Sequence, residues 1–129
     1  MKRLSLLFFF VMFLISCGND DNDCSGNLVC TTEFRSILVE VLNSDGTRVI
    51  FDEFTVTNLQ TNETINLEWE SGDFYPIADD SMRHDLPSGG QQLELVGFIN
   101  GQEVLRQVFL VGADCCHILL LEGDTTIQL

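Results

Sequence analysis

The sequence predicts an all-β fold, a single antiparallel β-sandwich of seven to eight strands. Three observations lead to this class. Apolar and polar residues alternate over several short stretches, which is the period of a half-buried strand. Polar turn signals separate these stretches, and no stretch carries apolar residues at helical spacing over ten residues. Many short strands joined by polar turns are typical of two packed antiparallel sheets.

The first expected strands lie between residues 36 and 69. Ile37, Val39 and Val41 share one face of the first strand. Residues 43–46 follow as a turn, in which Gly46 can adopt a positive φ. A second set of strand-forming residues runs from 49 to 59, and a polar turn follows at 60–63. The stretch 64–69 then alternates again and ends in Trp69.

The second half contains one irregular stretch and the clearest hairpin. Residues 74–78 are expected to form a short strand, and residues 79–90 a long loop. Asn100-Gly101, flanked by strand patterns at 93–99 and 102–111, is a strong signal for a two-residue type I′ turn. Residues 115–122 and 125–129 are the last expected strands.

Residues 1–16 have the layout of a signal peptide, with a positive start and an apolar core at 4–15. A membrane-spanning helix needs about 20 apolar residues, so this core is too short for a stable anchor. At the end of this core, Leu14-Ile15-Ser16-Cys17 resembles a bacterial lipobox. The resemblance implies a diacylglyceryl thioether and an acylated amine on Cys17, and several acyl chains hold a protein durably at a membrane. A plain secretory signal with a coincidental cysteine would not explain the leucine and serine before Cys17.

Residues 17–29 are expected to form the lipidated cysteine and a flexible acidic tether. Residues 18–23, Gly-Asn-Asp-Asp-Asn-Asp, contain no apolar side chain and cannot contribute to a core. The run lacks the spacing of a calcium loop. It resembles the Bacteroidetes-type signal that sends lipoproteins to the outer face of the outer membrane, with a solvated spacer as the alternative. We therefore expect a protein anchored at the outer membrane and facing the cell exterior.

The charge balance limits the partners. Removal of the first 16 of 129 residues leaves 113 residues, enough for one domain, with four Arg, no Lys, and all twenty Asp and Glu. The resulting net charge of −16 repels phosphate backbones and anionic headgroups, so nucleic acid is not an expected partner. Membrane attachment must then come from the lipid on Cys17.

Four cysteines remain beside the lipidated one: Cys24, Cys30, Cys115 and Cys116. An even number in an exported protein indicates disulfides, and four cysteines allow three pairings. Zinc binding, with His117 as a further ligand, is the alternative. Disulfides are favoured because the compartment is oxidising and the spacing of Cys24 and Cys30 is longer than that of a zinc knuckle. We expect no metal and no cofactor.

Four segments of the chain carry a family resemblance. They are Cys30-Thr31-Thr32-Glu33-Phe34, Tyr75-Pro76-Ile77-Ala78-Asp79-Asp80-Ser81, the Gly97–Gly101 hairpin and Asp114-Cys115-Cys116-His117-Ile118. Together they resemble the carboxypeptidase regulatory-like group of small sandwiches, which are similar to transthyretin, and more narrowly small uncharacterised lipoproteins of that plan. The resemblance spans residues 30–129 and implies a sandwich domain there, with no known chemistry.

The resemblance also favours one cysteine pairing. In such relatives a single cysteine usually stands directly before the histidine, so Cys116 is the expected main partner of Cys30. Cys24–Cys115 is then the second disulfide, which departs from the group's pattern. Adjacent cysteines on a strand would point to opposite faces.

Trp69, Phe74 and Tyr75 are the candidate ligand-binding residues, because aromatic rings close to acidic residues could bind a sugar or another ligand. Glu68, Glu70 and Asp73 are the acidic neighbours. The favoured alternative is that Trp69 and Tyr75 fill the core, as aromatic residues of small sandwiches commonly do.

No catalytic residue is expected. The chain contains neither a Gly-x-Ser-x-Gly elbow nor a histidine-rich metalloprotease motif. His84 is expected in an exposed loop, and His117 on a strand near a disulfide. A calcium site formed by Asp79, Asp80 and Asp85 is less expected than a solvated loop.

These observations predict a non-enzymatic, lipid-anchored surface lipoprotein that acts as a binding or accessory module. Domains of this plan brace or extend larger assemblies, which suggests an outer-membrane protein partner by analogy of fold. The alternative is a small glycan- or ligand-binding surface lipoprotein that uses the region 69–75.

Overall fold

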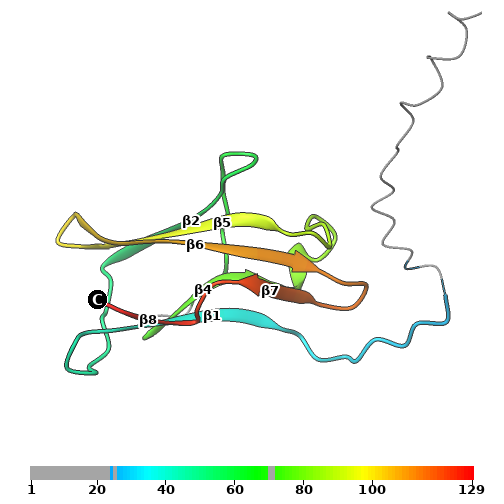
Figure 1. Ribbon diagram of the computed structural model, residues 1–129, viewed down its shortest axis with the longest axis horizontal. Helices are drawn as coiled ribbons and strands as arrows, with labels where there is room; N and C mark the ends of the chain where they lie inside the picture. The colour runs from blue at the N-terminus through cyan, green and yellow to red at the C-terminus, as the bar shows by residue number, and fades with distance from the viewer. Residues whose placement is uncertain (1–23, 25, 70–71) are drawn as a thin grey trace, which may run out of the picture.

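The computed structural model describes residues 24, 26–69 and 72–129 and shows two β-sheets packed face to face (Figure 1). The predicted β-sandwich is therefore confirmed, with eight strands and no α-helix among the described residues. The predicted signal peptide, the lipidated Cys17 and the acidic run 18–23 lie outside these residues. None of the described residues forms a helix long and apolar enough to cross a membrane.

The smaller sheet has the strand order β4-β1-β8. β1 (Ser36–Leu42) is central and pairs antiparallel with β4 (Phe74–Asp79), with Ser36 opposite Asp79. β8 (Thr126–Gln128) pairs parallel with β1, which differs from the all-antiparallel prediction. The chain leaves β7 at Gly123 and crosses to the other sheet, so it meets β1 running in the same direction.

The larger sheet has the order β3-β2-β5-β6-β7 and is antiparallel throughout. The hairpin of its two longest strands turns at Asn100 and Gly101, whose φ angles of 51° and 73° match the predicted type I′ turn. The strands are β2 (Glu53–Asn58), β3 (Glu63–Thr64), β5 (Gln91–Ile99), β6 (Gln102–Ala113) and β7 (Ile118–Glu122).

Two predicted elements differ from the structure. The strand expected over 64–69 is wrong, because only the two residues of β3 pair with β2. The rest of this stretch turns away and brings Trp69 against Phe54, at 5.1 Å between ring centroids, so aromatic packing outweighs the local alternation. In the loop expected at 79–90, a short 3₁₀-helix η1 (Asp80–Met82) forms, capped by the Asp79 side chain.

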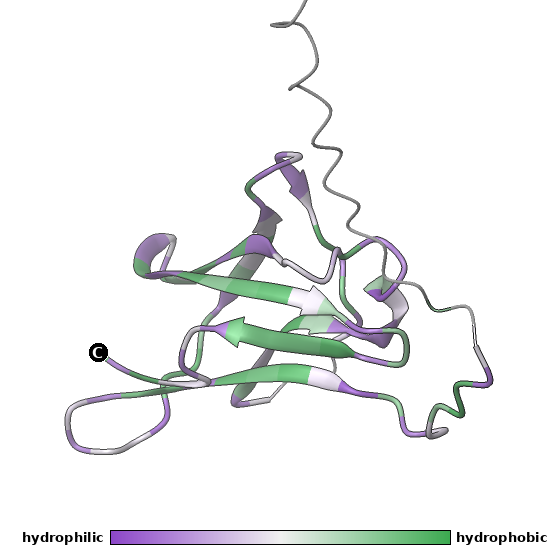
Figure 2. Cartoon of the chain, turned by 45° about the vertical axis from the view of Figure 1, so that its right-hand side comes forward, coloured by the Kyte–Doolittle hydropathy of each residue, from purple (hydrophilic) through white to green (hydrophobic). Residues whose placement is uncertain are grey.

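The core lies between the two sheets and is formed by buried apolar side chains of both. Figure 2 shows that hydrophobic residues are concentrated in the strands, whereas many loops are hydrophilic. Gly97 of β5 is required at its position, because a Cβ there would lie 2.4 Å from the Phe51 ring. The largest fully buried side chains are Tyr75, Phe109, Ile77, Leu93, Leu95, Val39, Val41 and Val111.

Tyr75 connects β4 to the segment between β1 and β2. Its fully buried hydroxyl accepts a hydrogen bond from the Phe51 backbone N–H at 2.8 Å and donates one to the Val49 carbonyl at 2.9 Å. Burial raises the pKa of this hydroxyl. Both backbone groups depend on Tyr75, since buried polar groups left without partners are costly.

Tyr75→Phe is therefore expected to lower the free energy of unfolding by about 2 kcal/mol, because it leaves a buried donor and a buried acceptor unpaired. Urea unfolding measures this difference. An unchanged unfolding midpoint would show that the two backbone groups find other partners.

Candidate functional site

Two disulfides join the segment before β1 to the bend between β6 and β7. They are Cys24–Cys115 and Cys30–Cys116, with Cα–Cα distances of 5.4 and 5.3 Å. This is the predicted pairing. Cys115 and Cys116 do not lie on a strand as expected; they occupy the bend at 114–117, where both neighbouring side chains can reach one incoming segment. We call residues 24, 26–31 and 114–117 the disulfide joint.

A buried histidine–aspartate pair lies beside this joint. His117 is 6% exposed, and its Nδ1 lies 2.8 Å from the Asp80 carboxylate at the start of η1. Its Nε2 lies 2.9 Å from the Thr31 hydroxyl. The same carboxylate accepts the backbone N–H groups of Ile118 at 2.9 Å and of Arg35 at 2.8 Å. Asp80 thus connects the start of β1 to the start of β7.

The pKa of Asp80 reflects two opposing effects. Burial alone would raise the pKa, but the hydrogen bonds from His117, Ile118 and Arg35 outweigh it and hold the pKa below its usual value. The pKa of Asp114 is lowered as well, because its carboxylate accepts the backbone N–H groups of His117 and Cys116, both at 2.7 Å. Both carboxylates are therefore stabilised in their ionised form.

The order Asp80–His117–Thr31 has the donor and acceptor pattern of a hydrolytic relay. In this structure the three residues join chain segments: the histidine is buried, the carboxylate holds two backbone amides, and Thr31 directly follows a disulfide cysteine. None of the three residues lines the groove described below. His84 is exposed as expected, and its Nε2 lies 2.9 Å from the Arg83 guanidinium.

The structure separates the three candidate ligand-binding residues. Tyr75 is fully buried in the core, so its predicted contact with a ligand is wrong. Trp69 packs one side of its indole toward Tyr75, at 6.0 Å between ring centroids, and remains 36% exposed. Phe74 is 41% exposed on the outer face of β4. The favoured core assignment thus holds fully for Tyr75 and partly for Trp69.

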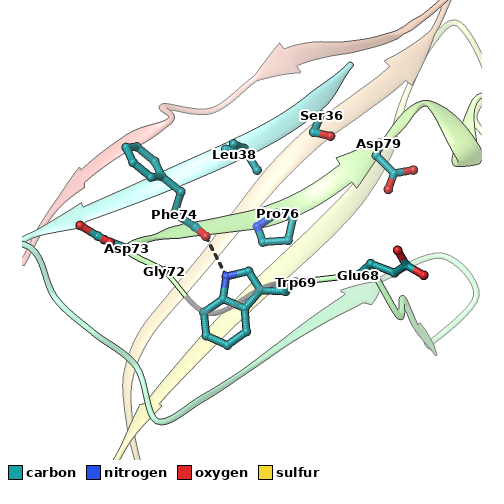
Figure 3. A pocket seen from close by; sticks show the side chains of 9 residues that line it. All are labelled: Ser36, Leu38, Glu68, Trp69, Gly72, Asp73, Phe74, Pro76 and Asp79. Carbon is teal, nitrogen blue, oxygen red and sulfur yellow. Dashed lines mark hydrogen bonds between the residues drawn. The ribbon is translucent and has the colours of Figure 1, made fainter. Parts of the chain in front are cut away.

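Trp69 and Phe74 line a groove of about 320 Å³ on the outer face of the smaller sheet (Figure 3). The Trp69 Nε1–H donates to the Phe74 carbonyl at 3.0 Å, which fixes the indole against the free edge of β4. The lining residues are Ser36 and Leu38 of β1, Phe74, Pro76 and Asp79 of β4, and Glu68, Trp69, Gly72 and Asp73 before β4. We call this hollow the β4 groove.

Acidic side chains lie at both ends of the β4 groove. Asp73, at one end, pairs with Arg48 at 2.6 Å, and this guanidinium also lies 4.9 Å from the centroid of the Phe74 ring. Glu68 and Asp79 lie toward the other end, as Figure 3 shows. Neither makes an ion pair with any described residue. Glu70, the remaining predicted acidic neighbour, lies outside the described residues.

The calcium site considered as the less favoured alternative for Asp79, Asp80 and Asp85 does not form among the described residues. Asp79 accepts hydrogen bonds from Ser81, while the Asp80 carboxylate bonds to His117, so the two carboxylates serve different partners. Among the described residues, no group of three or more His, Cys, Asp or Glu side chains is placed to hold a metal ion.

Sequence reasoning found the aromatic and acidic residues at 68–74 but missed Leu38, Pro76 and Asp79. These belong to β1 and β4, and only strand pairing brings them beside Trp69. No family model, curated protein or solved structure matches the chain. The resemblance to carboxypeptidase regulatory-like lipoproteins therefore stays a prediction.

Proposed function

We propose that this chain is a lipid-anchored, non-enzymatic lipoprotein of the outer membrane that faces the cell exterior and acts as a binding or accessory module. The proposal is supported by the lipobox-like residues 14–17 and by the acidic run 18–23 behind them, which resembles an export signal to the cell surface. The lipid on Cys17 supplies the attachment, because the acidic domain has no basic surface to bind anionic headgroups.

The observation that carries this proposal is the disulfide joint. Cys24 follows the proposed lipidated cysteine by seven positions and is bonded covalently to the bend between β6 and β7. A force applied to the lipid would therefore reach the sandwich first through a disulfide, before it reached the N-terminal end of β1. Such reinforcement suits a module displayed at a surface.

The position of the joint also suits display. The joint lies at one end of the sandwich, whereas the β5–β6 hairpin and the C-terminus lie at the other end (Figure 1). In the segment between Cys24 and Cys30, Leu28 and Val29 are 58% and 93% exposed, next to the end that the lipid would hold at the membrane. The opposite end and the sides of the sandwich are then available to a partner.

The chemistry of the polar clusters supports a binding role over catalysis. Asp80, His117 and Asp114 use their polar atoms to hold backbone amides and one another. The second candidate function, glycan or ligand binding, is favoured by one observation: two partly exposed aromatic rings share a groove with carboxylates.

Metabolic labelling with an alkyne fatty acid, in a bacterium that processes lipoproteins, tests the anchor. The wild-type chain is expected to carry the label, and Cys17→Ser to lose it completely, because the thioether can form only at this position. The double variant Cys24→Ser/Cys115→Ser is the matched control and should keep the label. Label retained in Cys17→Ser, or absent from the wild type, would contradict the proposal. Protease treatment of intact cells then tests exposure on the outer face.

A further inference from the structure

We propose that the β4 groove binds a basic side chain, arginine or lysine, presented by an extended segment of a protein partner. This inference rests on the proposed binding function and names the chemistry that the groove recognises. The stem of the basic residue would lie on the apolar floor, and its cationic head would meet Glu68 and Asp79.

The charges of the groove are complementary to a cation. Glu68 and Asp79 line the same end, close to Ser36 at the start of β1. The nearby basic residues are engaged elsewhere: Arg48 pairs with Glu40 and Asp73, both at 2.6 Å, and Arg35 lies 3.9 Å from Glu33. An incoming cation would therefore meet two carboxylates that have no cationic partner among the described residues. The net charge of the mature domain favours the same sign of ligand at longer range.

The floor of the groove suits the long stem of such a side chain. Leu38, Trp69 and Phe74 are all large apolar residues, each more than a third exposed, and they come together in this one hollow. Arginine and lysine pack their methylene stems on apolar surfaces while the charged head reaches polar groups. Aromatic faces also attract cations, and the guanidinium of Arg48 already lies over Phe74.

The edge of β4 disfavours strand addition as the binding mode. The Phe74 carbonyl points away from β1, toward the free edge of β4, where it accepts a hydrogen bond from the Trp69 indole N–H. Backbone groups two residues apart point to the same side of a strand, so the backbone nitrogen of Pro76 also lies on this free edge. Proline has no N–H, so this position offers no donor. A partner strand would find one acceptor occupied and one donor absent. Recognition therefore depends on side chains.

The size of the groove separates a single side chain from a glycan. A hollow of about 320 Å³ lies at the lower limit of ligand pockets. Trp69 and Phe74 are the aromatic rings that a ligand in the groove can reach. The third candidate ring, Tyr75, is buried between the sheets and cannot extend them into a longer platform for a glycan. One side chain fills this space, whereas an oligosaccharide would extend beyond it.

The test uses the tryptophan emission of the full, processed chain in detergent, because Trp69 is its only tryptophan. The probes are blocked glycine pentapeptides with one central arginine or lysine, the lysine peptide with its amine acetylated, and a neutral tetrasaccharide. The basic peptides are expected to change the emission saturably, and the other two probes to have no effect. Added salt should weaken the binding.

The double variant Glu68→Gln/Asp79→Asn is expected to weaken binding of the basic peptides about tenfold, because both ion pairs are lost. Asparagine keeps the capping role of Asp79. Glu63→Gln/Glu122→Gln changes the net charge equally at exposed positions outside the groove and should leave affinity within about twofold.

Equal weakening by both double variants would overturn the inference in favour of a general charge effect. Saturable binding of the tetrasaccharide without the basic peptides would assign the groove to glycans, and no response to any probe would remove it as a site. Labelling at Cys17 does not depend on the groove, so the anchoring and the groove can fail separately.

Discussion

Replacing all four paired cysteines by serine is expected to lower the free energy of unfolding by about 7 kcal/mol, more than the two disulfides removed one at a time would suggest. The reason is their arrangement. Cys24–Cys115 and Cys30–Cys116 join the same two segments, with sequence separations of 91 and 86. Once one bond has closed the long loop of the unfolded chain, the other closes only a ring of about nine residues.

The chain-entropy treatment gives the magnitudes. Closing the long loop is worth about 4.6 kcal/mol, and closing the short ring about 2.5 kcal/mol. Removing either pair leaves one long-range bond in place, so Cys24→Ser/Cys115→Ser and Cys30→Ser/Cys116→Ser should each cost about 2.5 kcal/mol. The quadruple variant also loses the covalent closure of the long loop in the unfolded chain. The two pairs are therefore coupled by about 2 kcal/mol in a mutant cycle.

Urea unfolding of the four proteins, with equal detergent and no reductant, measures this cycle. Whole pairs are replaced together, because a single change would leave a free thiol beside the remaining bond. Strict additivity, with each pair costing half of the total, would contradict the parallel closure of one loop. A loss of about 7 kcal/mol is comparable to the whole stability of a small domain, so the quadruple variant should be partly unfolded at 37 °C.

Most of the fold could be predicted because its signals are local. Alternation at 36–42 and the Asn100-Gly101 turn depend only on residues next to one another, and both appear as expected. The parallel placement of β8 could not be predicted, since it depends on which sheet edge remains unpaired after the other strands assemble. The strand prediction over 65–69 is wrong because Trp69 packs on Phe54 of β2. The alternation of apolar and polar residues along the sequence carries no information about such a contact between distant positions.

The candidate site was predictable to a smaller extent. Glu68, Asp73 and the aromatic rings at 69 and 74 are close in sequence, and their shared role as lining residues follows from that closeness. Asp79 and Leu38 enter the groove through the pairing of β4 with β1. The bond between Asp80 and His117 spans 37 positions, and no periodic pattern in either segment points to the other.

Asp80→Asn is expected to lower the free energy of unfolding by about 3 kcal/mol at pH 7, although it changes one atom. The Asp80 side chain is only 10% exposed and accepts hydrogen bonds from His117 and from the backbone of Arg35 and Ile118. The asparagine side chain has one oxygen acceptor where aspartate has two, and its NH2 group faces other donors. At least one of these N–H groups therefore loses its partner. Asp124→Asn, an exposed change of equal charge, should stay within about 0.5 kcal/mol.

The pH dependence identifies the ionised carboxylate as the cause. The folded-state pKa of Asp80 lies below its unfolded value, so the ionised group stabilises the fold above the unfolded pKa, and this stability is lost as pH falls through the folded pKa. Asp114 is present in both proteins, so its own titration cancels when wild type is compared with Asp80→Asn, and the difference reports Asp80 together with its direct partner His117. The difference in unfolding free energy, measured from pH 7 to pH 2.5, should be constant at first and shrink below about pH 4. A difference that stays constant down to pH 2.5 would mean that the shape of the side chain, and not its charge, joins β1 to β7.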